Sequence, residues 1–107
     1  MTEKVGMDKK KVALVTGSSS GIGYETALLL ARNGFDTFAT MRNMNKSKEI
    51  TEVSKRENLP LRVMQLDVND DRSVANTINN ILNEKKSIQV VVNNAGYGLM
   101  GSVEDSD

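Results

Sequence analysis

The sequence contains no cysteine and no histidine, and only one proline among its 107 residues. Without cysteine there is no disulfide framework and no thiol nucleophile. Without histidine, Ser-His-Asp and Cys-His catalysis are excluded, and so are the usual zinc sites. We therefore expect no catalytic group of these kinds and no metal ligands in this chain.

The chain also has no excess of either charge. Lysine and arginine together number 14, and aspartate and glutamate together number 14, so the formal net charge is zero. A neutral chain gives no electrostatic reason to expect nucleic acid or a membrane surface as a partner. The first ten residues, MTEKVGMDKK, lack the apolar centre of a signal peptide, and no apolar run approaches the length of a membrane span. We expect a soluble, cytoplasmic protein with one domain at most.

Short apolar, β-branched runs alternate along the chain with stretches of helical periodicity. Continuously apolar runs are typical of strands buried on both faces of a parallel sheet. They predict strands over 12–16, 36–40, 61–68 and 88–93. Helices are predicted over 22–33, 44–57 and 70–86. This alternation predicts an α/β fold with right-handed crossovers and helices on both faces of the sheet.

Particular residues support the first and third of these helices. In the first, apolar and polar residues recur at helical spacing: Ile22, Thr26, Leu29, Leu30 and Asn33. Gly34 follows, where a helix favours a left-handed residue. In the third, one stripe holds Val74, Ile78, Ile81 and Leu82, and Asn69 or Asp70 is the expected cap.

The stretch VTGSSSGIGYE places three glycines and three serines between the first strand and the first helix. The first N–H groups of a helix lack partners and its dipole is positive there, so this end suits a phosphate. Gly17 can adopt a turn closed to other residues, Gly21 lets the backbone approach a diphosphate, and Gly23 lets the helix pack on the strand. The hydroxyls of three serines can donate to phosphate or ribose oxygens: Ser18, Ser19 and Ser20.

The glycine spacing limits the class of nucleotide that this loop could bind. The pattern Gly-x-x-x-Gly-x-Gly differs from the common Gly-x-Gly-x-x-Gly fingerprint and lacks the Gly-Lys-Ser/Thr ending of a nucleoside-triphosphate loop. No lysine follows closely enough to reach a γ-phosphate, which disfavours ATP or GTP hydrolysis. An ordinary strand-to-helix turn is the structural alternative.

Three motifs together resemble the short-chain dehydrogenase/reductase family of the classical type. They are TGSSSGIG at 16–23, LDV at 66–68 and NNAG at 93–96. The resemblance extends over residues 10–105, and FATMRN at 38–43 is similar to the steroid and retinol dehydrogenase-like branch. It implies a Rossmann-type, doubly wound parallel sheet with strand order 3-2-1-4, with the ligand at the carboxyl ends of the strands.

The resemblance also implies which residues bind the cofactor. The glycine loop with Ile22 would hold the diphosphate, while Asp67 and Val68 would contact the adenine. Asn94, Ala95 and Gly96 would line the ribose and nicotinamide side. Asn93 is expected to be structural and to tie this turn to neighbouring strands.

The end of the second strand selects between the two nicotinamide cofactors. NAD enzymes place a carboxylate about 20 residues beyond the glycines to accept from the ribose 2′-hydroxyl. This chain has Met41 followed by Arg42. A guanidinium can pair with a 2′-phosphate in a forked geometry, so we expect NADP(H) in preference to NAD(H).

Family catalysis needs a tyrosine, a lysine four residues later and an upstream serine. Leu28 and Gly101 stand four residues after the two tyrosines, Tyr24 and Tyr97, so neither fits. We therefore interpret 1–107 as the N-terminal, NADP(H)-binding part of a short-chain oxidoreductase. Its catalytic and substrate part would be absent, and the fragment would have no turnover of its own.

Two other functions stay open from the sequence. One is a non-enzymatic module that senses a dinucleotide or binds a partner, and the other is a flavodoxin- or receiver-like domain. With the order 3-2-1-4 and no fifth strand beside the fourth, Val90, Val91 and Val92 would lie at an exposed sheet edge. Such an edge favours pairing, so we expect a homo-oligomer formed through the fourth strand.

Overall fold

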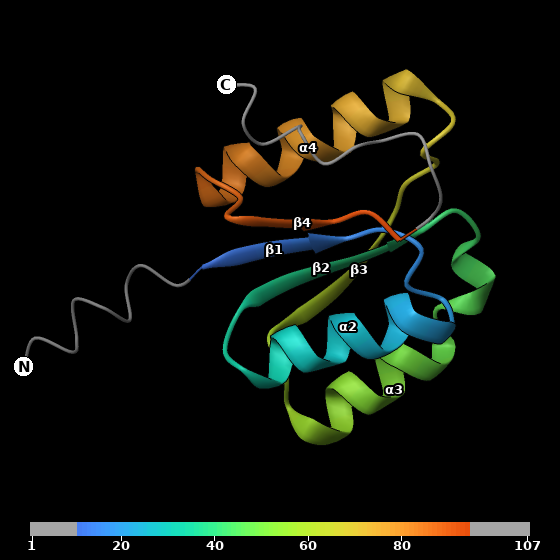
Figure 1. The fold of residues 1–107 in the computed structure, drawn as a ribbon, viewed down its shortest axis with the longest axis vertical. Helices are drawn as coiled ribbons and strands as arrows, with labels where there is room; N and C mark the ends of the chain where they lie inside the picture. The colour runs from blue at the N-terminus through green and yellow to red at the C-terminus, as the bar shows by residue number, and fades with distance from the viewer. Residues whose placement is uncertain (1–10, 95–107) are drawn as a thin grey trace, which may run out of the picture.

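The computed structural model describes residues 11–94 and shows a four-stranded parallel sheet between helices (Figure 1). Along the chain the elements are β1 (Val12–Val15), α2 (Gly21–Arg32), β2 (Asp36–Met41), the 3-10 helix η1 (Met44–Lys46), α3 (Lys48–Glu57), β3 (Leu61–Gln65), α4 (Asp71–Lys85) and β4 (Val90–Val92). The strands lie in the order β3-β2-β1-β4, and all neighbours are parallel. The predicted α/β class and the 3-2-1-4 order are confirmed.

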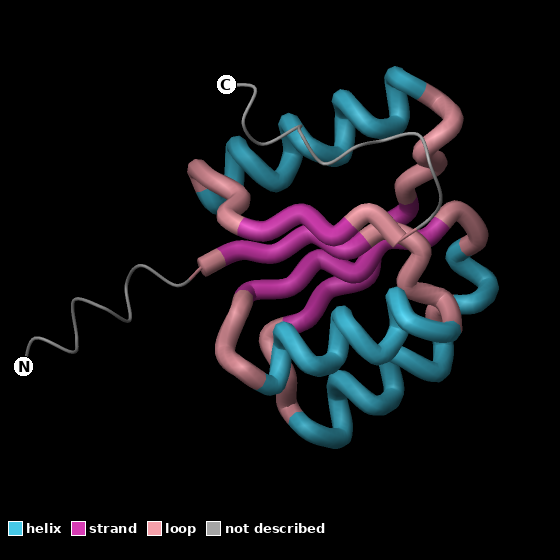
Figure 2. The backbone as a smooth tube through the Cα atoms, viewed as in Figure 1, coloured by secondary structure: helices cyan, strands magenta, loops and turns pink. Residues whose placement is uncertain are grey.

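Helices cover both faces of the sheet: α2 and α3 lie on one side and α4 lies on the other (Figure 2). All four residues of β1 are buried, and three of them divide between two apolar clusters on opposite faces of the sheet. Val15 joins the α2 and α3 side, whereas Leu14 and its register partner Phe38 join the α4 side. Burial of each such side chain contributes about 1.5–3 kcal/mol, which explains why the central strand is apolar throughout.

The helix ends follow the expected local chemistry. Gly34, with a φ of +91°, takes the left-handed conformation after α2. The Asp70 side chain caps α4 by accepting from the N–H groups of Arg72 and Ser73 at 3.0 and 3.4 Å. Both predicted termini are therefore confirmed.

The buried face of α2 differs from its expected apolar pattern. Gly23, Ala27, Leu28 and Ala31 are buried, whereas Ile22 is 74% exposed and Leu29 is 60% exposed. Small residues four apart let the helix approach the sheet closely, and this close packing outweighs burial of the larger side chains. In α4, similarly, Ile81 is buried but Leu82 is exposed.

Three predicted elements differ from the structure by more than one residue at a boundary or are divided. The helix expected over 44–57 is divided into η1 and α3 at Ser47. The third strand ends at Gln65, so the LDV motif lies in the following loop, and β4 begins at Val90.

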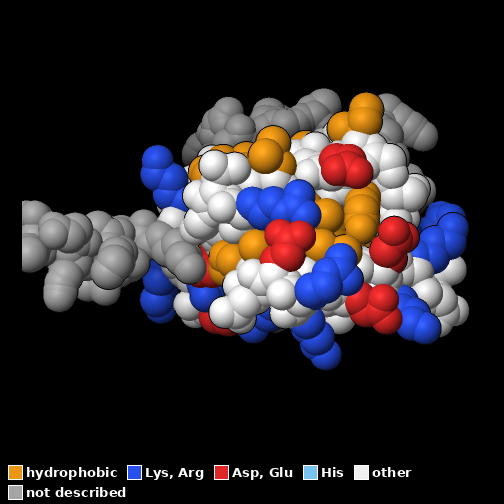
Figure 3. Space-filling view, turned by 90° about the horizontal axis from the view of Figure 1, so that it is seen from below, with side chains coloured by type: hydrophobic (Ala, Val, Ile, Leu, Met, Phe, Trp, Pro, Cys, Tyr) orange, Lys and Arg blue, Asp and Glu red, His pale blue; other side chains and the backbone are white. Residues whose placement is uncertain are grey.

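On the face that carries α2 and α3, basic and acidic side chains are intermixed (Figure 3). One bidentate pair there joins the two helices, with Arg32 donating to Glu57 at 2.7 and 2.6 Å.

Candidate functional site

A hollow of about 320 Å³ lies at the carboxyl ends of β1, β2 and β3. It brings together several of the residues that the sequence singled out, although they come from different parts of the chain. Its lining consists of Gly17, Ser19, Met41, Arg42, Asn43, Lys46, Leu66, Asp67, Val68 and Asn69. The glycine loop, the end of β2 and the LDV motif therefore share one site.

Two glycines of the loop have backbones that other residues rarely adopt. Gly17 has a φ of +65° and Gly21 a φ of +62°. Gly23 is needed for a different reason: a Cβ there would stand 2.0 Å from the carbonyl oxygen of Gly17 and 2.8 Å from Nδ2 of Asn94. The start of α2 is thus packed directly against the loop and the turn after β4, as predicted for close packing of this helix.

The three serines of the loop do different things. Ser18 is fully buried; its hydroxyl donates to the carbonyl of Val15 at 3.1 Å and its N–H donates to the carbonyl of Thr40 at 3.0 Å. The expectation that all three hydroxyls face a ligand is therefore wrong for Ser18, because the fold uses this hydroxyl to satisfy a buried carbonyl. Ser19 lines the hollow, and Ser20 is exposed.

The N-terminus of α2 has no side-chain cap. Ser20 occupies the N-cap position in extended conformation, but its hydroxyl accepts no capping hydrogen bond. The first turn contains no acidic residue. Since the first N–H groups of a helix have no intrahelical acceptors and the dipole is positive there, this end can receive an anion from outside the chain.

Thr16 connects the glycine loop to the turn after β4. Its hydroxyl donates to Oδ1 of Asn93 at 3.0 Å and accepts from the N–H of Asn94 at 2.9 Å. The structural role predicted for Asn93 is supported by this contact. Asn94 also lies against Gly23, whereas Ala95 and Gly96 lie outside the described residues.

Asp67 lies in the loop after β3, where its own turn orients the carboxylate. Oδ1 accepts from the N–H of Asn69 at 3.0 Å, and the N–H of Asp67 donates to the hydroxyl of Ser73 at 3.0 Å. Leu66 is held beside β2 through its N–H, which donates to the carbonyl of Met41 at 3.0 Å. The partly buried Asp67 is therefore presented at the hollow by a hydrogen-bonded loop.

Two cations face the same hollow. Arg42 follows β2 directly, and Gln65 donates from Nε2 to its carbonyl at 3.1 Å. Lys46 ends η1, and the sequence reasoning missed it together with Asn43 and Asn69. The only sequence signal for Lys46 was a second cation four residues after Arg42, because the turn that brings it back could not be recognised.

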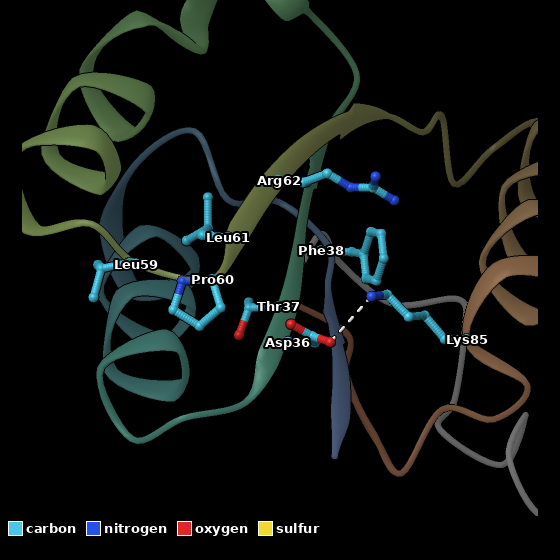
Figure 4. Close-up of a pocket in the computed structure, with 8 residues that line it drawn as sticks. All are labelled: Asp36, Thr37, Phe38, Leu59, Pro60, Leu61, Arg62 and Lys85. Carbon is cyan, nitrogen blue, oxygen red and sulfur yellow. Dashed lines mark ion pairs between the residues drawn. The ribbon is translucent and has the colours of Figure 1, made fainter. Parts of the chain in front are cut away.

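A second hollow, of about 230 Å³, lies at the amino ends of β2 and β3, at the opposite edge of the sheet (Figure 4). Its charged groups are satisfied within the chain: Lys85 pairs with Asp36 at 3.1 Å, and Arg62 pairs with Glu84. The Arg62 guanidinium also lies over the Phe38 ring, 5.0 Å from its centre. Both cations that line this hollow are therefore already paired, and an anionic ligand would have to compete for them.

Tyr24 is the one tyrosine among the described residues, and it packs against the core beside α3. Burial, followed by the carboxylates of Glu49 and Glu25, raises its pKa above the ordinary value of 10.0. A tyrosine that passes protons near neutral pH needs the opposite shift, a lowered pKa.

Within residues 11–94 no cluster of three metal-ligating side chains occurs, and no helix there is long and apolar enough to cross a membrane.

Comparison with known proteins identifies the family. The short chain dehydrogenase profile matches residues 11–107. Retinol dehydrogenase 8 from Bos taurus is 43% identical over 91% of this chain and 32% of its own length, and 17-beta-hydroxysteroid dehydrogenase type 1 from Homo sapiens is 36% identical over 89% and 30%. The chain thus spans about a third of these relatives.

Solved structures show the same fold. Menthone neomenthol reductase from Mentha piperita matches with a TM-score of 0.72 and 32% identity over 82% of this chain and 32% of that one. Actinorhodin polyketide ketoreductase, solved with NADPH, matches with a TM-score of 0.76 and 27% identity over 85% and 34%. With its glycine loop, parallel sheet and profile match, the chain belongs to the short-chain dehydrogenase/reductase family of oxidoreductases.

Proposed function

We propose that this chain is the NADP(H)-binding part of a short-chain oxidoreductase, which transfers hydride between the nicotinamide and a carbonyl or alcohol substrate. The observation that carries the cofactor choice is Arg42 at the end of β2. It is exposed, lines the hollow beside the glycine loop, and has no ion-pair partner within residues 11–94. Actinorhodin polyketide ketoreductase, a structural relative, was solved with NADPH.

The residues present fit such a cofactor. The uncapped start of α2 and the backbone of Gly21 would hold the diphosphate, and the absence of a side chain at Gly23 keeps that helix close to the loop. Asp67 and Val68 would contact the adenine, and Asn94 would lie on the ribose and nicotinamide side. When bound, the nicotinamide supplies the hydride; the chain binds and orients the cofactor.

We further propose that turnover depends on residues outside this chain. Tyr24 is packed against the core with a raised pKa, and Leu28 rather than lysine follows it by four positions. The oxidoreductase relatives do not favour a non-enzymatic sensing module. The carbonyl or alcohol class of the substrate, the cytoplasmic location and the roles of Ala95 and Gly96 stay predictions.

We also propose that the 107-residue chain self-associates through β4. Val90, Val91 and Val92 form the last strand of the sheet, and each is only partly buried. Within residues 11–94, β4 pairs with β1 alone. An apolar strand with an unpaired edge favours pairing with a second edge, so a homo-oligomer is the expected state.

The cofactor proposal is tested by titrating wild-type protein and the Arg42→Gln variant with NADPH and NADH. A hydrogen-bonded charge pair contributes about 1.5–3 kcal/mol, so NADPH affinity should fall about 10- to 150-fold. NADH affinity should change less than about twofold, since NADH has no 2′-phosphate. Arg56→Gln, at an exposed position of α3, is the matched control. Equal losses for both cofactors would count against the proposal.

A further inference from the structure

The C-terminus of α2 is an asparagine followed by a glycine, Asn33 and Gly34. Asn33 is the only one of the eleven asparagines in the sequence that precedes a glycine. In such a pair the backbone nitrogen of the glycine can attack the side-chain carbonyl carbon of the asparagine, because no Cβ shields that nitrogen. Both residues are exposed, so water can reach the place where this reaction would occur.

The glycine nitrogen is held by the turn that ends the helix. Gly34 has a φ of +91°, and its N–H donates to the carbonyl of Ala31 at 3.0 Å. The N–H of Phe35 donates to the carbonyl of Leu30 at 3.1 Å, which completes a Schellman motif. The attacking nitrogen must lose the proton that it donates here, and so the reaction requires this turn to open.

The side-chain amide that would leave is held as well. Nδ2 of Asn33 donates to the carbonyl of Leu29, one turn earlier in the helix, at 2.8 Å. Each intramolecular hydrogen bond shifts an opening equilibrium by about 2- to 12-fold. The two bonds that hold the reacting groups should therefore slow the reaction about 5- to 150-fold relative to the unfolded chain.

We propose that Asn33 is a site of spontaneous deamidation, and that opening of the C-terminus of α2 sets the rate. The backbone nitrogen of Gly34 bonds to Cγ of Asn33, and the side-chain amide leaves as ammonia with the proton from that nitrogen, so a cyclic imide forms. Water then opens the imide at either carbonyl, which gives aspartate or isoaspartate. The net reaction consumes water, releases ammonia and needs no enzyme.

The product cannot restore the end of the helix. A carboxylate has no proton to donate, so the hydrogen bond to the carbonyl of Leu29 is lost. The new negative charge also lies at the C-terminus of α2, where the helix dipole is already negative. Isoaspartate in addition lengthens the main chain inside the Schellman motif. Deamidation is therefore a one-way loss of stability that begins where this helix opens.

The first test compares wild-type protein incubated at neutral pH with and without urea. Peptide mapping by mass spectrometry follows the conversion of amide to acid at every asparagine. In urea, Asn33 should convert before the other asparagines, and without urea its conversion should be about 5- to 150-fold slower. Earlier conversion of another asparagine in urea overturns the site. Equal rates with and without urea overturn the control by α2.

The second test compares Leu29→Gly with Leu29→Ala. The Leu29 side chain is 60% exposed, and both variants remove it, but glycine also weakens the helix. Leu29→Gly should therefore deamidate about fivefold faster than Leu29→Ala without urea and at the same rate in urea. Thermal melts verify that both variants fold. Equal rates without urea overturn the proposal that opening of α2 limits the reaction.

The third test measures the effect of the product. Asn33→Asp should lower Tm by about 5–10 °C, because it removes a hydrogen bond and adds an unfavourable charge. Asn33→Ala, which removes the same hydrogen bond and adds no charge, should lower Tm by about half as much. A Tm for Asn33→Asp equal to that of wild type overturns the loss of stability.

Discussion

Gly23→Ala tests the contact on which the cofactor loop depends. The added Cβ would stand 2.0 Å from the carbonyl oxygen of Gly17, 2.8 Å from its carbonyl carbon and 2.8 Å from Nδ2 of Asn94. Ordinary contacts begin near about 3.5 Å, so the loop must move by roughly 1 Å or more. Two of the three atoms are backbone, and rotation of a side chain cannot relieve these overlaps.

The expected magnitude follows from two opposing effects. Overpacking costs about 1–3 kcal/mol, and a clash with backbone belongs at the upper end of that range. Alanine in a helix recovers about 1 kcal/mol relative to glycine. The net loss in free energy of unfolding should therefore be about 2 kcal/mol, or roughly 10 °C in Tm for a chain of this size. Displacement of the loop should also weaken NADPH at least about tenfold.

Gly34→Ala provides the matched control at the other end of the same helix. Gly34 has a φ of +91°, and a Cβ added there would meet no atom within 4 Å, so its cost is backbone strain alone, about 1–2 kcal/mol. Because this position is remote from the glycine loop, NADPH affinity should not change. Urea unfolding followed by circular dichroism and NADPH titration measure both effects. A Gly23→Ala protein with wild-type stability and affinity would refute the reasoning.

Two further predictions concern the surface and the sheet edge. The hydrogen bond from Arg32 holds the pKa of Glu57 below its ordinary value of 4.5, so the stabilisation by this pair is present above that pH and is lost as pH falls through the lowered pKa. Thermal melts of wild type and Glu57→Gln should differ slightly at pH 7 and converge in acid; an equal difference at both would contradict this. For the proposed pairing of β4, light scattering should show mass increasing with concentration, whereas a monomer at high concentration would contradict it.

The strand order came from the family resemblance, whereas the sequence alone determined the alternation of strands and helices and the parallel sheet. These features depend on local signals: apolar runs such as Val12–Val15, a left-handed glycine at 34 and an aspartate cap at 70. The glycine loop could also be predicted from sequence, because its positive φ values and close approach demand particular residues at fixed spacing.

Only the tertiary structure decided which side chains face the site and which serve the fold. Ser18 donates to Val15 inside the core, although the sequence placed it beside equivalent serines. In α2 the face with Gly23, Ala27, Leu28 and Ala31 is buried, whereas Ile22 and Leu29 are exposed. Lys46 reaches the hollow through a short turn. The buried face of α2 and the hollow that Lys46 lines depend on contacts between residues far apart in the chain, because the glycine loop, the end of β2 and the loop after β3 meet only in the folded sheet.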